Sequence, residues 1–110
     1  MHLTKDQLKK FDEDGYLFFP NLFTKEEVKC LSSEVPKLYN IRAEYNYREK
    51  GSDLVRTNFA AHLYSKPFAK LARHPRMILP VEDILKEKLY MHQFKINGKM
   101  AFEGDVWQWH

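Results

Sequence analysis

The order of the helix-forming and strand-forming segments constrains the fold of this 110-residue chain most strongly. Residues 89–97 and 106–110 are rich in aromatic and branched side chains, which is typical of strands, whereas helical patterns dominate before them. Helices followed by strands predict an α+β fold. Two or three strands cannot close a barrel or form a two-sheet sandwich, so we expect the chain to be the N-terminal part of a longer protein.

Two capping boxes predict where the first two long helices begin. Thr4 is followed three residues later by Gln7, and Thr24 is followed by Glu27. In this motif the threonine hydroxyl accepts a hydrogen bond from an amide of the first turn, and the longer side chain reaches back to the threonine amide. One helix is therefore predicted to begin after Thr4 and a second after Thr24.

The remaining patterns divide one predicted domain, residues 1–110, into two parts. Residues 1–88 are expected to be mainly helical, and residues 89–110 are expected to form the first strands of the core. Within the helical part, residues 16–19 are predicted to form a short, mostly buried strand. Residues 43–53 are polar and contain a glycine, which predicts a surface loop.

The composition excludes several classes of protein. The net charge is only +3, and the 18 basic residues are scattered among 15 acidic ones, so nucleic-acid binding is not expected. No run of 18 apolar residues predicts a membrane span. The single cysteine, Cys30, rules out an internal disulfide and suits a reducing compartment. The first ten residues lack the apolar core of a secretory signal, so we expect a cytoplasmic protein.

Strand alternation groups three polar side chains near the end of the chain. Gln93, Lys95 and Asn97 are predicted to lie on one face of a strand, with Phe94 and Ile96 on the other. Two amides and a cation in a row could hold a small carboxylated ligand through charge-assisted hydrogen bonds. The alternative is that the row is the solvated face of a half-buried sheet.

The other residues that could carry chemistry form no complete motif. His110 alone is insufficient for a metal site, which needs at least two further ligands, and the remaining histidines lack the HExxH spacing. The sequence contains no GxSxG turn, no glycine-rich phosphate loop and no cysteine nucleophile motif. These patterns alone predict a soluble α+β domain with a polar ligand face.

A resemblance to a known family extends this prediction. Residues 90–99, YMHQFKINGK, and residues 104–110, GDVWQWH, resemble the region of the phytanoyl-CoA dioxygenase family, especially its ectoine-hydroxylase-like members, that leads into an iron-binding His-x-Asp motif. The residues that match in order and spacing are Gln93, Ile96, Asn97, Lys99, Trp109 and His110. The resemblance covers nearly the whole chain, with further similar segments at residues 11–31, 55–62, 68–72 and 75–76.

This resemblance implies a role for each matching position. His110 would be the first of two histidines that bind iron(II), and the aspartate expected two positions later lies beyond the chain. Asn97 would hydrogen-bond the cosubstrate 2-oxoglutarate, and Trp107 would form a wall of its pocket. Gln93 and Lys95 would face the prime substrate.

The resemblance also implies a fold and a reaction. The fold would be a cupin-like double-stranded β-helix (a jelly roll), of which this chain supplies the N-terminal helices and the first strands. Iron(II), 2-oxoglutarate and molecular oxygen would hydroxylate a small-molecule metabolite. The sequence departs from the ectoine hydroxylases at Lys95, where they have arginine, at Phe94, and in residues 100–103. These departures disfavour ectoine as the substrate.

With one metal ligand and unpaired strands, the 110 residues alone are expected to be inactive, to bind iron weakly and to form no stable monomer.

Two other functions remain open. One is a non-enzymatic module whose tryptophan-rich end docks a partner protein. The other is a halogenase of the same superfamily, in which a small residue replaces the iron-binding aspartate. The residue two positions beyond His110 distinguishes these alternatives, whereas the oligomeric state and the substrate are not determined by the sequence.

Overall fold

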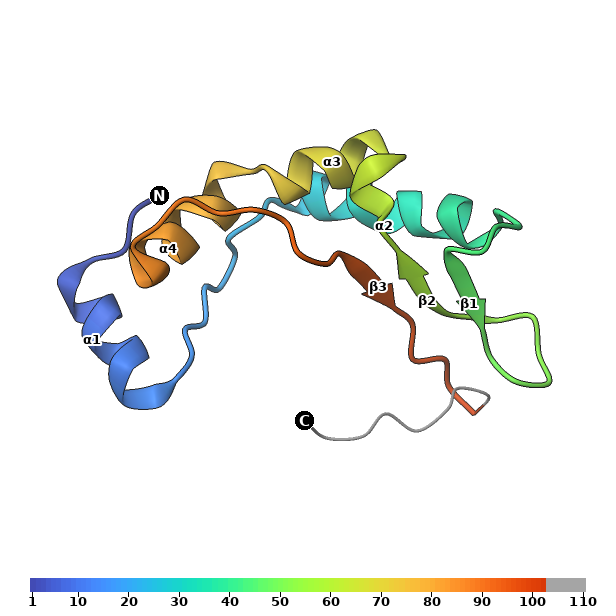
Figure 1. Ribbon diagram of the computed structural model, residues 1–110, viewed down its shortest axis with the longest axis horizontal. Coiled ribbons are helices and arrows are strands. Elements are labelled where there is room, and N and C mark those ends of the chain that lie inside the picture. The colour runs from blue at the N-terminus through green and yellow to red at the C-terminus, as the bar shows by residue number, and fades with distance from the viewer. Residues whose placement is uncertain (103–110) are drawn as a thin grey trace.

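The computed structural model describes residues 1–102 of the chain (Figure 1). Its elements are, in order, α1 (Lys5–Asp14), α2 (Lys25–Tyr39), β1 (Asn46–Arg48), β2 (Val55–Phe59), the 3-10 turn η1 (Ala61–Leu63), α3 (Lys66–Ala72), α4 (Pro75–Leu85) and β3 (Lys95–Asn97). Within these residues, no helix has both the length and the apolar character that crossing a membrane requires.

Both predicted capping boxes are present. The Thr4 hydroxyl accepts from the Gln7 amide at 3.1 Å, and Gln7 Oε1 accepts from the Thr4 amide at 2.9 Å. Thr24 and Glu27 make the same reciprocal pair at 3.1 and 3.2 Å. Helix α1 ends at Gly15, whose φ of +80° is the left-handed conformation that glycine adopts without steric cost. Local sequence therefore determines where these helices begin and where α1 ends.

The three strands form one antiparallel sheet with β2 in the centre. Helices α2 and α3 pack against one side of this sheet (Figure 1). The core between helices and sheet consists of the buried residues Leu38, Ala61 and Phe68, and Leu31, Val35, Leu71, Phe94 and Ile96 pack against it. The sheet thus has a covered face and a second face that points away from these helices.

The predicted α+β class is confirmed. The double-stranded β-helix is not shown by residues 1–102, which contain one three-stranded sheet. Residues 1–88 supply all five helical elements of the described chain, but they also supply β1 and β2. The sheet is therefore built mostly from the part that was expected to be mainly helical.

Two of the local predictions were wrong. Residues 16–19 form no strand, and the side chains of Tyr16 and Phe18 are 64% and 80% exposed. No strand of the described chain lies beside them to pair with their backbone groups.

Residues 43–53, predicted to be a surface loop, contain β1, whose Asn46 is only 7% exposed. Polar composition was misleading here because the Asn46 amide is hydrogen-bonded in the interior.

The predicted strand over residues 89–97 is present only at its end. Residues 95–97 pair with β2, whereas residues 89–94 run from α4 toward the sheet without strand pairing (Figure 1). The second predicted strand, residues 106–110, lies outside the described residues.

Candidate functional site

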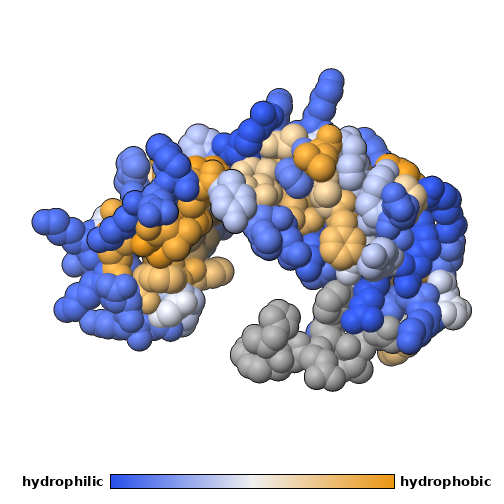
Figure 2. All heavy atoms as spheres, viewed as in Figure 1, coloured by the Kyte–Doolittle hydropathy of each residue, from blue (hydrophilic) through white to orange (hydrophobic). Residues whose placement is uncertain are grey.

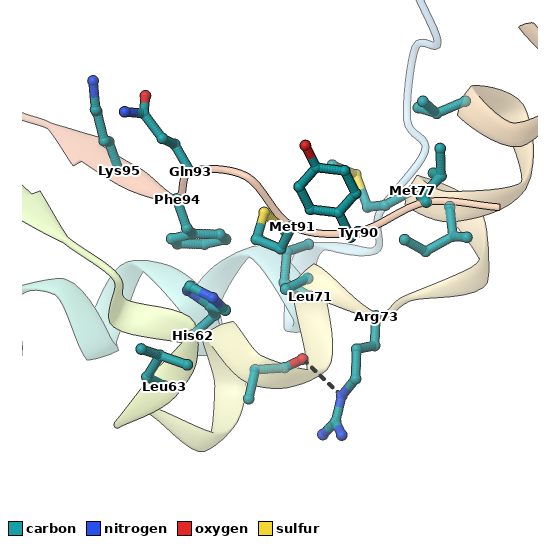
Figure 3. Close-up of a pocket in the computed structure, with 15 residues that line it drawn as sticks. His62, Leu63, Leu71, Arg73, Met77, Tyr90, Met91, Gln93, Phe94 and Lys95 are labelled. Atoms are coloured by element: carbon teal, nitrogen blue, oxygen red, sulfur yellow. Dashed lines mark hydrogen bonds between the residues drawn. The ribbon is translucent and has the colours of Figure 1, made fainter. Parts of the chain in front are cut away.

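The two sides of β3 have different environments. Phe94 and Ile96 pack against the core, whereas Lys95 and Asn97 are exposed on the opposite side. Gln93 is also exposed, and its side chain points away from the helices together with that of Lys95 (Figure 3). The structure therefore brings Gln93, Lys95 and Asn97 to one side, as strand alternation predicts.

Strand pairing adds three residues that the sequence analysis did not identify. Thr57 lies opposite Asn97, Phe59 lies opposite Lys95, and Tyr47 lies opposite Thr57. Directly paired residues of antiparallel strands project to the same face. We call the face formed by Tyr47, Thr57, Phe59, Lys95 and Asn97 the Lys95 face. Alternation within residues 55–59 was the only sequence signal for Thr57 and Phe59, and it could not show which strand they pair with.

A hollow of about 780 Å³ lies along the Lys95 face. The residues that line it include the two lysines Lys50 and Lys95 and the acidic Glu44. Arg48 also borders it, but its guanidinium is paired with Asp53 at 3.9 Å and donates to the Tyr39 carbonyl. The two ammonium groups favour an anionic ligand here, because opposite charges raise the local concentration of a binding partner. Thr57 and Asn97 add neutral hydrogen-bonding groups to the same hollow.

A second hollow of about 810 Å³ lies between the segment before β3 and helices α3 and α4 (Figure 3). Its lining is mainly apolar and includes Leu71, Met77 and Met91. Its polar and charged members include His62, Arg73, Gln93 and Lys95. Lys95 lines both hollows. A small molecule with an apolar part and an acidic group would find both kinds of surface around this one lysine.

A buried polar network behind the sheet holds the Lys95 face in place. Asn58, which is fully buried, donates through Nδ2 to Asn46 Oδ1 at 2.6 Å. Asn46 Nδ2 donates to the carbonyl oxygens of Leu38 and Ile41, each at 2.8 Å. The Tyr64 hydroxyl donates to Asn58 Oδ1 at 3.0 Å, and burial raises the pKa of Tyr64 while this hydrogen bond opposes the shift. The network ties the end of α2 to β1 and β2.

Close backbone packing determines the position of Asn97 on this face. The next residue, Gly98, donates its amide hydrogen to the Arg56 carbonyl at 2.9 Å. A Cβ atom at Gly98 would lie 3.0 Å from the Val55 carbonyl oxygen and 3.1 Å from the Tyr39 hydroxyl. Because only glycine fits this approach without displacing a neighbour, the end of β3 has little freedom to move.

The metal-binding prediction cannot be placed on this site. His110 and Trp107 both lie outside the described residues. Within residues 1–102, no group of three histidine, cysteine, aspartate or glutamate side chains is arranged to hold a metal ion. The described residues fit an acidic organic ligand through their cations and amides, but they do not by themselves provide a donor set for iron.

The chain is similar to known proteins over almost its whole length. Residues 11–110 match the family model described as phytanoyl-CoA dioxygenase (PhyH). The chain is 36% identical to an ectoine dioxygenase from Bordetella bronchiseptica over 98% of its own length, and 30% identical to an L-proline trans-4-hydroxylase from Streptomyces griseoviridis over 96%. It spans only 36% and 39% of these two relatives.

The similarity extends to solved structures. The crystal structure of EctD from S. alaskensis with bound Fe superposes on 98% of this chain with a TM-score of 0.89 and 28% sequence identity. The structure of the same protein with 2-oxoglutarate and 5-hydroxyectoine superposes on 93% of it with a TM-score of 0.84. This chain covers 40% and 38% of those two chains.

Proposed function

The chain belongs to the phytanoyl-CoA dioxygenase family, and we propose that the whole protein is an iron(II)- and 2-oxoglutarate-dependent dioxygenase that hydroxylates a small-molecule metabolite. The similar proteins are named for oxygenation of small molecules, ectoine and L-proline. The EctD structures contain Fe in one case and 2-oxoglutarate with 5-hydroxyectoine in the other. These similarities support the same cofactor and cosubstrate for the whole protein.

The Lys95 face is the observation that carries this proposal. It presents the exposed Asn97 amide and Lys95 ammonium beside a hollow, on a sheet held by a buried network. In the proposed site, Asn97 donates a hydrogen bond to a carboxylate oxygen of 2-oxoglutarate, and Trp107 lines the cosubstrate pocket. Gln93 and Lys95 face the prime substrate.

Iron(II) is proposed to bind through His110. An imidazole is one of the three ligands in the two-histidine, one-carboxylate set that holds non-haem iron in oxygenases. When bound, the metal supplies the oxidising chemistry together with 2-oxoglutarate and molecular oxygen. The role proposed for the described residues is to bind the two organic ligands, to orient them and to exclude water.

Replacing the proposed metal ligand tests this function. In the whole protein supplied with iron(II) and 2-oxoglutarate, His110→Ala should abolish succinate formation, because the metal loses one of its few protein ligands. His92→Ala is the matched control, since His92 is an exposed histidine without a proposed role in metal binding. An unchanged rate of succinate formation in His110→Ala would contradict the assignment.

A further inference from the structure

The ammonium of Lys95 lies over an aromatic ring. Its Nζ is 5.5 Å from the ring centroid of Phe59, which is the residue directly opposite on β2. Within residues 1–102, no carboxylate forms an ion pair with Lys95. A cation within about 6 Å of a ring centroid is attracted by the negative face of the ring. In the described part of the chain, Phe59 is therefore the group that holds this charge.

Phe59 is itself held rigidly. Its ring makes an edge contact with Tyr47, with centroids 5.0 Å apart and an interplanar angle of 72°. Its amide donates to the Tyr45 carbonyl at 2.8 Å, and the next amide, that of Ala60, donates to the Phe94 carbonyl at 2.8 Å. These hydrogen bonds on both sides fix the backbone that carries the ring, and the contact with Tyr47 restricts the ring itself, so Phe59 provides a defined surface for a flexible lysine.

A lysine needs such a surface more than an arginine does. Arginine presents a rigid planar fork that defines its own binding direction, whereas the lysine ammonium is a point charge on a flexible stem. Contact with the ring leaves ammonium hydrogens free to donate elsewhere, because the group has three donors and the ring uses only its face. Lys95 also lines the hollow of the Lys95 face, where its own charge favours an anionic group.

We propose that Phe59 is a positioning residue that holds the Lys95 ammonium where the acidic group of the prime substrate binds, so that the substrate is a small acid. This inference rests on the proposed dioxygenase function. Phe59 acts through Lys95 and does not contact the reacting atoms. The adjacent apolar hollow accommodates the remainder of the substrate.

The test uses the whole protein with iron(II), 2-oxoglutarate and a panel of L-amino acids, each compared with its primary amide. Succinate formation with the cosubstrate alone is measured first. The acids should stimulate it and the amides should not, because only the acids carry the carboxylate that Lys95 binds. If no succinate forms under any condition, the proposed function itself is wrong. If succinate forms but acids and amides act alike, or neither stimulates, the inference about Phe59 and the acid is wrong.

Substitutions at Phe59 then isolate the ring. Phe59→Leu should raise KM for the most effective acid about fivefold, the upper size expected for a cation–π contact of an exposed lysine, with kcat and KM for 2-oxoglutarate changed less than about twofold. Phe59→Tyr keeps the ring and should restore KM. Replacing Phe59 by 4-cyanophenylalanine keeps its packing but weakens the negative ring face, so KM should rise about threefold even if Phe59→Leu folds poorly.

The matched control is Phe68→Leu, which makes the same change in the core on the covered side of the sheet. It should lower thermal stability without changing KM for the acid. Equal KM values for the wild type, Phe59→Leu and the 4-cyanophenylalanine variant would overturn the positioning role. An equal rise in KM in Phe59→Leu and Phe68→Leu would show that the effect is general destabilisation.

Discussion

The two ends of this molecule are held together by different interactions. At the sheet end, the fully buried Asn58 and the buried Leu38 join strands to helices through a polar network and an apolar core. At the other end, α1 buries no residue. The segment before it is attached to α4 through Asp83, which accepts from the Leu3 amide at 2.7 Å and lies 3.0 Å from His2, and the half-buried Leu8 and Phe11 of α1 border a small hollow with Ile84 of α4. Figure 2 shows apolar side chains gathered around α4 and a mostly polar surface near the sheet.

This difference shows which end can hold a site with a defined geometry. A buried polar group that loses its partner costs about 1–3 kcal/mol, so the network around Asn58 strongly favours one arrangement of β1 and β2. The contact of His2 with Asp83 lies at the surface, where ion pairs contribute about 0–1 kcal/mol and weaken with salt, so this part of the attachment is adjustable. The candidate site lies on the sheet, where the arrangement is specified by buried groups.

The largest expected effect comes from breaking the buried network. Asn58→Ala removes the donor to Asn46 and one of the two acceptors near the Tyr64 hydroxyl, the other being the Phe59 carbonyl, and it should lower the free energy of unfolding of the whole protein by about 1–3 kcal/mol. Asn40→Ala is the matched control because Asn40 is exposed, and it should change stability by less than about 0.5 kcal/mol. Urea denaturation measures both values. Similar losses in the two variants would show that the network does not hold the sheet.

Substitution of Asn97 tests whether a residue of the proposed site affects ligand binding without affecting the stability of the fold. Asn97 is exposed on the strand next to Asn58, so Asn97→Ala should leave the free energy of unfolding within about 0.5 kcal/mol of the wild type. Loss of its proposed hydrogen bond should raise the 2-oxoglutarate concentration required for half-maximal succinate formation about tenfold. The requirement for prime substrate should change less, and equal changes for both would contradict the proposed division of roles between Asn97 and Gln93.

The smallest expected effect concerns the attachment of α1. The Leu3 amide, and then the His2 side chain, hold the pKa of Asp83 below its usual range. A lowered pKa in the folded state means that this stabilisation is present above about pH 3.9, the usual value for aspartate, and is lost as the pH falls through the folded-state pKa. Asp83→Asn removes the negative charge of this side chain at neutral pH, as protonation of the aspartate does at low pH.

Amide hydrogen exchange measures this effect. Asp83→Asn should speed exchange at Leu3 and in the first turn of α1 while leaving β2 and β3 unchanged. Asp12→Asn serves as the control, because the Asp12 side chain is exposed and makes no hydrogen bond or ion pair with the rest of residues 1–102. Faster exchange at Lys95 or Asn97 in Asp83→Asn would show that the two ends are coupled and that the comparison above is wrong.

Part of this structure could be predicted because it depends on neighbours in the sequence. The capping boxes at Thr4 and Thr24 use groups three residues apart, and the end of α1 needs only the freedom of Gly15. The two sides of β3 follow from backbone alternation, which separates Lys95 and Asn97 from Ile96 in any strand. Once each helix or strand forms, its neighbouring residues specify these features.

The remainder was decided by segments far apart in the chain. Residues 16–19 have a strand-like composition but no pairing strand in the described chain, whereas the polar β1 is a strand because the Asn46 amide finds buried carbonyl partners. The pairing of Phe59 with Lys95 joins positions on different strands that no local pattern relates.

The sequence by itself determined helix starts, strand faces and family membership. Tertiary structure decided which faces meet, because a buried hydrogen bond or a cation–ring contact exists only once both partners are in place.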